Sequence, residues 1–172
     1  IQLKGGTAML SKLSLTFGSR QILQGIINKY PDRKFKLMQA SVHSNNLALF
    51  DFSNEPTIFK SPVEYTVLGE RLNSNYRGIL YYQSFQVDND QQKVLFNTLS
   101  KMVDDPSPLI NGQAFLQVDN KDESTTLVLF TALNDFDDLM TWKETEDFKQ
   151  LASFTTRDPN NTYYDEVYRP LM

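Results

Sequence analysis

The chain of 172 residues has no cysteine and only one histidine, His43. Without thiols it has no disulfides, no thiolate nucleophile and no cysteine-ligated zinc. The predicted place of His43 in a hairpin turn favours an exposed residue over a metal ligand or a general base. No acidic cluster has the spacing of metal ligands, and the glycine patterns of Walker and dinucleotide-binding loops do not occur. We therefore predict no metal site and no cofactor.

Long apolar runs and basic clusters are missing as well. The longest apolar runs comprise a few residues, far below the roughly 20 that span a bilayer. The 17 Lys and Arg are scattered among 21 Asp and Glu, and the net charge is -4, whereas nucleic-acid-binding surfaces carry clustered basic residues. No secretion signal is visible at the N-terminus. These absences predict a cytoplasmic protein that binds neither nucleic acid nor membranes.

One order of predicted elements, β-α-β-β-α, is present twice. In the first copy, a strand over 12–17 precedes a helix capped by Ser19 and a hairpin over 34–52. A short strand at 57–59 and a helix over 61–72 follow. The second copy comprises a strand over 78–87, a helix capped by residues 88–90, a hairpin over 114–133, a helical region over 135–151 capped by Asn134, and a closing strand over 162–168. This order is typical of an α+β fold with two tandem ferredoxin-like units.

The predicted helix over 61–72 has the clearest local signal in the chain. Ser61 is a favoured N-cap residue, Pro62 suits the first helical position, and Glu64 completes a capping box. These residue types predict a helix that ends the first half.

The predicted division of the chain falls in the Asn-Ser-Asn stretch that precedes residue 76. Residues 9–75 would form an N-terminal ferredoxin-like half and residues 76–172 a C-terminal half. Residues 1–8 precede Met9, the expected start, and are interpreted as an N-terminal extension or a cloning remnant. A ferredoxin-like sheet has one open face, which a second sheet can cover. We therefore predict two halves packed sheet to sheet, as in a dimeric α+β barrel, and a monomer or homodimer.

Several motifs occur along the chain in a characteristic order. They are Leu15–Ser19 with Ile22 and Leu23, Leu37–Gln39, Phe59–Pro62 with Tyr65 and Val67, and finally Phe136, Leu139, Trp142, Phe148 and Lys149. Their order resembles the TRAP family (target of RNAIII-activating protein), which also includes haem-degrading monooxygenases of Gram-positive bacteria. The last motif is similar to the antibiotic biosynthesis monooxygenase domain. The resemblance covers essentially Met9 to Met172 and implies a bacterial protein of dimeric α+β barrel architecture.

The chain departs from this family at positions that matter for chemistry. Haem-degrading members are similar in having an iron-ligating His in the last helical region and an Asn on the first strand of the C-terminal half. Here the first position falls near Ala152 and Ser153, and the second at Gln83. Regulatory members are described as phosphorylated on a His that has no match in this chain. The resemblance therefore does not carry the family's activity over to this protein.

The candidate site lies in the predicted C-terminal half. Its residues are Tyr81, Tyr82, Gln83 and Ser84 on the predicted central strand, with Trp142 and Phe148 across from them in the last helical region. Aromatic and amide side chains of this kind could line a concave apolar pocket with a few polar anchors, suited to an aromatic small molecule. The alternative is that these residues are simply part of the hydrophobic core, and the sequence favours both interpretations equally.

Three functions follow from these interpretations. The first is a small-molecule oxygenase or ligand-binding protein without a His-ligated haem, since oxygenation of a suitable substrate needs only a dry pocket and hydrogen bonds to an anion. The second is a non-catalytic regulatory or interaction protein. The third is a haem monooxygenase with a substituted axial ligand. A cavity between Gln83 and Trp142 would favour the first function, and a pocket filled by Tyr81 or Phe148 would favour the second.

Overall fold

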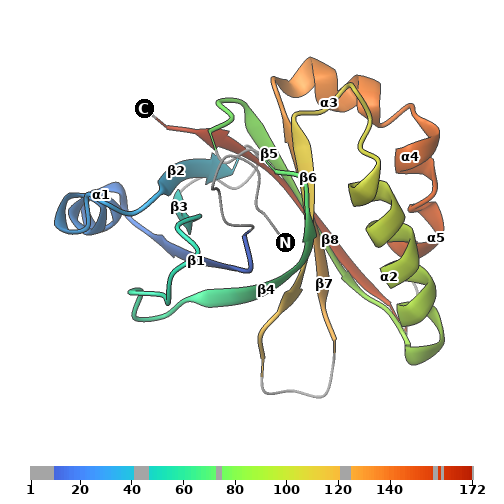
Figure 1. Ribbon diagram of the computed structural model, residues 1–172, viewed down its shortest axis with the longest axis horizontal. Coiled ribbons are helices and arrows are strands. Elements are labelled where there is room, and N and C mark those ends of the chain that lie inside the picture. The colour runs from blue at the N-terminus through green and yellow to red at the C-terminus, as the bar shows by residue number, and fades with distance from the viewer. Residues whose placement is uncertain are drawn as a thin grey trace, which may run out of the picture.

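The computed structural model describes residues 10–40, 47–72, 75–120, 125–156, 159 and 161–171. Within these ranges, the strands form a closed antiparallel barrel with helices packed on two opposite sides (Figure 1). In chain order the elements are β1 (Lys12–Gly18), α1 (Arg20–Lys29), β2 (Phe35–Ala40), β3 (Leu47–Asp51), β4 (Val63–Glu70), β5 (Ile79–Gln86), α2 (Asn89–Asp104), β6 (Gly112–Val118), β7 (Leu127–Leu133), α3 (Phe136–Trp142), α4 (Glu146–Lys149), α5 (Ala152–Thr155) and β8 (Thr162–Pro170).

The strand order shows a duplicated unit. Around the barrel the strands run β1-β3-β2-β8-β5-β7-β6-β4. In each half, the fourth strand pairs with the first and the third lies between the first and the second, which is the ferredoxin-like order. The halves join where β2 pairs with β8 and where β4 pairs with β6. The predicted α+β fold, two ferredoxin-like units packed sheet to sheet, is confirmed.

The predicted helix over 61–72 is wrong, because Val63–Glu70 forms strand β4. This strand pairs with β1 on one side and with β6 on the other, so both edges of its backbone are hydrogen-bonded. A capping box stabilises a helix by roughly 1 kcal/mol, whereas pairing with two strands satisfies a whole segment of backbone and buries Tyr65. Tertiary pairing therefore outweighs the local signal of Ser61. The short strand predicted at 57–59 is also not formed.

Other predicted helix starts are confirmed. The Ser19 side chain accepts a hydrogen bond from the backbone N–H of Ile22 at 3.3 Å, and that of Asp88 accepts one from Gln91 at 3.1 Å. The last helical region begins one residue later than predicted, with Asp135 as its N-cap. It also divides into three short helices, because Thr145 caps a new helix only three residues after α3 ends.

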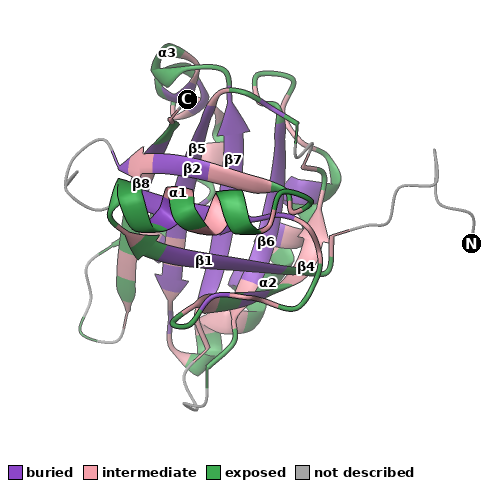
Figure 2. Ribbon diagram, turned by 90° about the vertical axis from the view of Figure 1, so that its left-hand side faces the viewer, coloured by how far each residue is buried: buried purple, intermediate pink, exposed green. Residues whose placement is uncertain are grey.

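The barrel interior is a core of aromatic rings. Five of its buried rings lie in contact with one another: Phe50, Tyr65, Tyr82, Phe130 and Tyr168. The hydroxyl oxygens of Tyr65 and Tyr82 lie 2.8 Å apart, so each phenol of this pair has a polar partner inside the barrel. Two further cores lie outside the barrel, one between α1 and its sheet and one between α2–α5 and theirs. Figure 2 shows the buried strands behind the largely exposed α1.

Candidate functional site

The candidate site lies on the outer face of the C-terminal sheet, under the helical layer formed by α2–α5 (Figure 1). Successive side chains of a strand point to opposite faces, and this separates the predicted site residues on β5. Tyr81 and Gln83 face the helices, whereas Tyr82 packs in the barrel interior and Ser84 shares its side of the strand. The structure therefore brings four of the six predicted residues together and places Tyr82 and Ser84 elsewhere.

Trp142 is the centre of the aromatic part of this site. Its side chain is fully buried at the end of α3. The ring of Phe148 meets the indole edge to face at a centroid distance of 5.3 Å, and the ring of Tyr81 does so at 6.5 Å. The ammonium group of Lys143 lies over Tyr81 at 4.9 Å and over Phe148 at 5.8 Å. Tyr81 and Phe148 thus fill the two flanks of Trp142, with a cation beside both rings.

A hydrogen-bond network joins β5 to β8 next to these rings. Gln83 donates from Nε2 to the Tyr163 hydroxyl at 3.0 Å. Tyr81 donates to the Asp165 carboxylate at 2.5 Å, and Tyr163 donates to the same oxygen at 3.3 Å. Because Asp165 lies opposite Gln83 in the strand pair, all four side chains share one face of the sheet.

The two phenols of this network stay protonated at neutral pH and donate hydrogen bonds. Burial raises the pKa of Tyr163 to about 12; its hydrogen bonds with Tyr81 and Gln83 oppose that rise, and the Asp165 charge adds to it. The pKa of Tyr81 is raised well above its ordinary value, first by burial and then by Tyr163 and Asp165. Neither phenol can act as a base near pH 7. The Asp165 carboxylate accepts a hydrogen bond from each of them.

Three buried polar atoms in this layer have no hydrogen-bond partner among the described residues. They are Oε1 of Gln83, Oε1 of Gln113 and Nε1 of Trp142, and all three side chains are fully buried. Gln113, at the start of β6, donates from Nε2 to Thr131 at 3.0 Å but leaves its oxygen unpaired. Each unpaired buried group costs about 1–3 kcal/mol, and native proteins have few of them. Such a group is a natural anchor for a polar ligand atom.

Sequence reasoning did not identify Tyr163, Asp165, Lys143 and Gln113 as site residues. A signal for the first two existed in the fold prediction itself. In a ferredoxin-like unit the fourth strand pairs with the first, so the predicted closing strand had to lie beside the predicted strand over 78–87. Lys143 and Gln113 have no such signal, because their positions depend on where α3 ends and where β6 begins.

The residues at which an iron-ligating His was expected do not fit a His-ligated haem. Ala152 and Ser153 lie on α5 with exposed side chains, and neither carries a strong donor for iron. His43 lies outside the described residues. Within those residues, no group of three His, Cys, Asp or Glu side chains is arranged to hold a metal ion. No described helix is both long enough and apolar enough to cross a bilayer. The cytoplasmic location and the oligomeric state stay predictions.

The fold is that of several proteins of known structure. A major regulator of staphylococcal pathogenesis superposes with a TM-score of 0.76 at 18% sequence identity, over 94% of this chain and 99% of that one. A monooxygenase-like protein from Listeria innocua superposes with a TM-score of 0.72 at 16% sequence identity, over 94% of each chain. A haem-degrading enzyme from Listeria monocytogenes superposes with a TM-score of 0.69 at 12% sequence identity, over 92% of this chain and 98% of that one. No protein-family model and no curated protein matches the sequence. The predicted resemblance is therefore confirmed at the level of the fold.

Proposed function

We propose that this protein binds an aromatic small molecule between the C-terminal sheet and its helical layer. The observation that carries the proposal is the pair of unpartnered, fully buried atoms Gln83 Oε1 and Trp142 Nε1. Gln83 Oε1 accepts a hydrogen bond and Trp142 Nε1 donates one. Together they suit either one ligand hydroxyl or a ligand that has both a hydroxyl group and an anionic oxygen. The Lys143 ammonium group beside the rings favours a ligand with negative charge.

The rings that flank Trp142 must move to admit such a ligand. Phe148 lies on α4, a helix of four residues, and α5 is equally short. Single-turn helices have little stability of their own, and segments of low local stability are those that open most readily. Phe148 is only partly buried, unlike Trp142. We therefore infer that the ligand enters by displacement of Phe148 and α4, while β5 and β8 keep the polar anchors in place.

Oxygenation of the bound molecule is the activity that we propose for this site. Structural neighbours include a monooxygenase-like protein and a haem-degrading enzyme. A substrate with an aromatic-flanked methylene can supply all four electrons that reduce O₂: the carbon becomes a carbonyl, and its two hydrogens leave with the second oxygen as water. The protein then needs only to stabilise the substrate anion, for which Trp142 Nε1 is a donor, and to accept its proton, for which Asp165 is the acceptor.

A second candidate function is non-catalytic regulation through protein interaction. The observation that favours it is the packing of Tyr81 and Phe148 directly against Trp142, which fills the flanks of the indole. A structural neighbour is a regulator of staphylococcal pathogenesis. The two candidate functions predict different results. An oxygenase consumes oxygen when a ligand is bound, whereas a non-catalytic regulator does not.

Gln83→Leu is expected to separate the role of the amide in binding from its role in stability. Leucine removes an unpaired buried acceptor but also the hydrogen bond from Gln83 Nε2 to the Tyr163 hydroxyl. The two effects are of similar size and opposite sign, so the free energy of unfolding should change by no more than about 1 kcal/mol. Binding of dithranol, a hydroxylated anthrone, should weaken about tenfold in calorimetric titration, because the ligand hydroxyl loses its acceptor. Oxygen uptake with dithranol, corrected for the reaction without protein, should fall in parallel.

Gln21→Leu is the matched control, because Gln21 is an exposed glutamine on α1, away from the C-terminal helical layer. It should change neither binding nor oxygen uptake. If the wild-type protein binds dithranol but takes up no oxygen, the proposal of a ligand-binding site stands and the proposal of an oxygenase is wrong. If the wild type does not bind the anthrone, or if Gln83→Leu binds it as well as the wild type, the proposed site is wrong.

Hemin titration is expected to show no His-ligated haem. Iron in haem proteins takes a strong axial donor such as His, Cys, Met or Tyr, and Ala152 and Ser153 supply none. The Soret band should therefore lack the position and sharpness of a His-ligated iron, and His43→Ala should titrate like the wild type. Stoichiometric hemin binding with the spectrum of a His-ligated iron, abolished in His43→Ala, would contradict this expectation and support the haem monooxygenase hypothesis.

A further inference from the structure

The N-terminal half lacks the second helix of its ferredoxin-like unit. Between β7 and β8 the C-terminal half places α3, α4 and α5, but between β3 and β4 the chain passes through residues 52–62 without forming a helix. Since the halves repeat one strand order, these two connections occupy equivalent places on their sheets. α1 is therefore left without a partner helix on its own sheet (Figure 2).

A groove of about 380 Å³ lies in this place, between α1 and residues 58–61. Its volume is within the range of small-molecule sites, roughly 300–1,000 Å³. Ile22 and Phe17 in its lining are 63% and 50% exposed, although both are large apolar residues. The lining is Thr16, Phe17, Ile22, Leu23, Ile26, Lys29, Tyr30, Ile58, Phe59, Lys60 and Ser61. The groove is thus mainly apolar and open to solvent along one side.

The wall opposite α1 is held by specific contacts. Arg33, which follows α1, forms an ion pair of 2.8 Å with the buried carboxylate of Asp51 and donates to the carbonyl oxygen of Pro56 at 2.9 Å. Phe59 is buried and stacks on Phe35 at a ring distance of 6.1 Å. A built wall of this kind keeps the groove open without a ligand, as preformed binding sites require.

The charges of the lining have one sign. Lys29 and Lys60 are its only ionisable groups besides the Tyr30 phenol, and no carboxylate lines the groove. The Lys29 ammonium lies 5.7 Å from the centre of the Tyr30 ring, and neither lysine forms an ion pair with another described residue. An apolar groove with these two lysine ammonium groups complements a molecule that has an apolar body and an anionic end.

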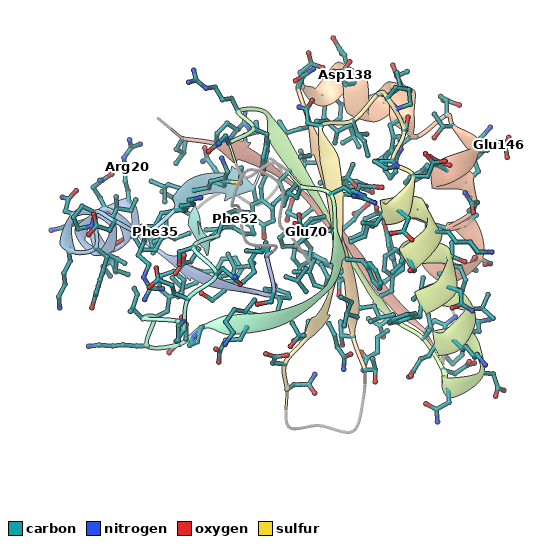
Figure 3. The ribbon with its side chains drawn as sticks, viewed as in Figure 1. Arg20, Phe35, Phe52, Glu70, Asp138 and Glu146 are labelled. Carbon is teal, nitrogen blue, oxygen red and sulfur yellow. The ribbon has the colours of Figure 1, made fainter. Side chains whose placement is uncertain are left out.

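We propose that this groove is a second binding site, for a medium-chain aliphatic carboxylate. The chain would lie along Ile22, Ile26 and Ile58, and the carboxylate would reach the lysine ammonium groups. This site is separate from the one proposed above. Figure 3 shows Arg20, the first residue of α1, and Phe35, the first residue of β2, at the opposite end of the molecule from Asp138 and Glu146 of the C-terminal helices. Its test is therefore independent of the oxygenase.

Titration with decanoate tests the site directly. Saturable calorimetric binding is expected, with amide chemical-shift changes in ¹H–¹⁵N spectra confined to α1, residues 58–61 and the end of β1. Decylamine, which has the same chain and the opposite charge, should bind at least tenfold more weakly, because two lysines repel it. Equal binding of the acid and the amine, shift changes centred on the C-terminal helices, or no saturation would each overturn the proposal.

Exposed positions supply variants that keep the fold. Ile22→Asp places a charge on the apolar wall and should weaken decanoate binding at least tenfold, whereas Val94→Asp, at an equally exposed apolar position on α2, should leave it unchanged. Lys60→Ala should weaken binding about two- to fivefold, the scale of an exposed ion pair; Lys101→Ala on α2 is its control. Wild-type affinity in both Ile22→Asp and Lys60→Ala would contradict the site.

Discussion

Phe130→Ala is expected to lower the free energy of unfolding by about 3–5 kcal/mol, the usual cost of removing a buried phenylalanine ring. Phe130 is fully buried in the barrel and its ring centroid lies 5.9 Å from that of Phe50, 6.0 Å from that of Tyr65 and 5.4 Å from that of Tyr82. These partner rings come from both halves of the chain, so the cavity left by the missing Phe130 ring weakens the packing of both halves. The melting temperature should fall by roughly 10 °C in calorimetry.

Phe136→Ala provides the matched control for this result. Phe136 is also a phenylalanine, but it lies on the C-terminal helical layer and its side chain is 54% exposed. We expect a change within about 0.5 kcal/mol, as at other surface positions. Because the barrel interior is shared, Phe130→Ala should keep a single unfolding transition by circular dichroism and by Trp142 fluorescence. Two separate transitions would show that the halves do not unfold as one unit.

Gly112→Ala is expected to destabilise the fold by about 3 kcal/mol or more. Gly112 has a φ of +142°, which L-residues rarely adopt, and a Cβ there would lie 2.2 Å from the carbonyl oxygen of Arg71. Strained backbone costs about 1–3 kcal/mol and overpacking a similar amount. The backbone around it cannot yield easily, because Arg71 exchanges hydrogen bonds with Gln113, and Asn111 donates to Ala132.

The same substitution at Gly25 should have the opposite sign. Gly25 lies in the exposed face of α1, and a Cβ there meets nothing within 4 Å. Alanine is favoured over glycine inside a helix by about 0.5–1 kcal/mol. Chemical denaturation of both variants measures the contrast. A Gly112→Ala protein as stable as the wild type would mean that the strand start can relax around a side chain.

Local signals predicted the elements whose local and tertiary preferences agree. Ser19 and Asp88 cap their helices as expected, because a side-chain oxygen and the first turn of a helix are close in sequence. The region around Ser61 has an equally clear cap but lies between two strands that need a partner. There the alternation of Val63, Tyr65 and Val67 was the better signal, and it is typical of a strand.

The candidate site was predicted in part for a similar reason. The choice of neighbours Tyr81 and Tyr82 as joint pocket residues conflicts with the two-residue period of a strand, which sends them to opposite faces. Applied strictly, that period selects Tyr81 and Gln83, and these are the two that lie with Trp142 and Phe148. The contacts of Lys143 depend on the break after α3, for which the sequence has no distinct pattern.

The pairing of β2 with β8 has a consequence for the synthesis of the protein. Met38 lies opposite Pro170 in that ladder, so the partner of β2 leaves the ribosome more than a hundred residues later. Until then, one edge of β2 has unpaired N–H and C=O groups and its apolar side chains are uncovered. Exposed edges of this kind invite pairing with other chains. Nascent chains should therefore depend on chaperones, or on slow translation of the first half, more than the stability of the finished barrel suggests.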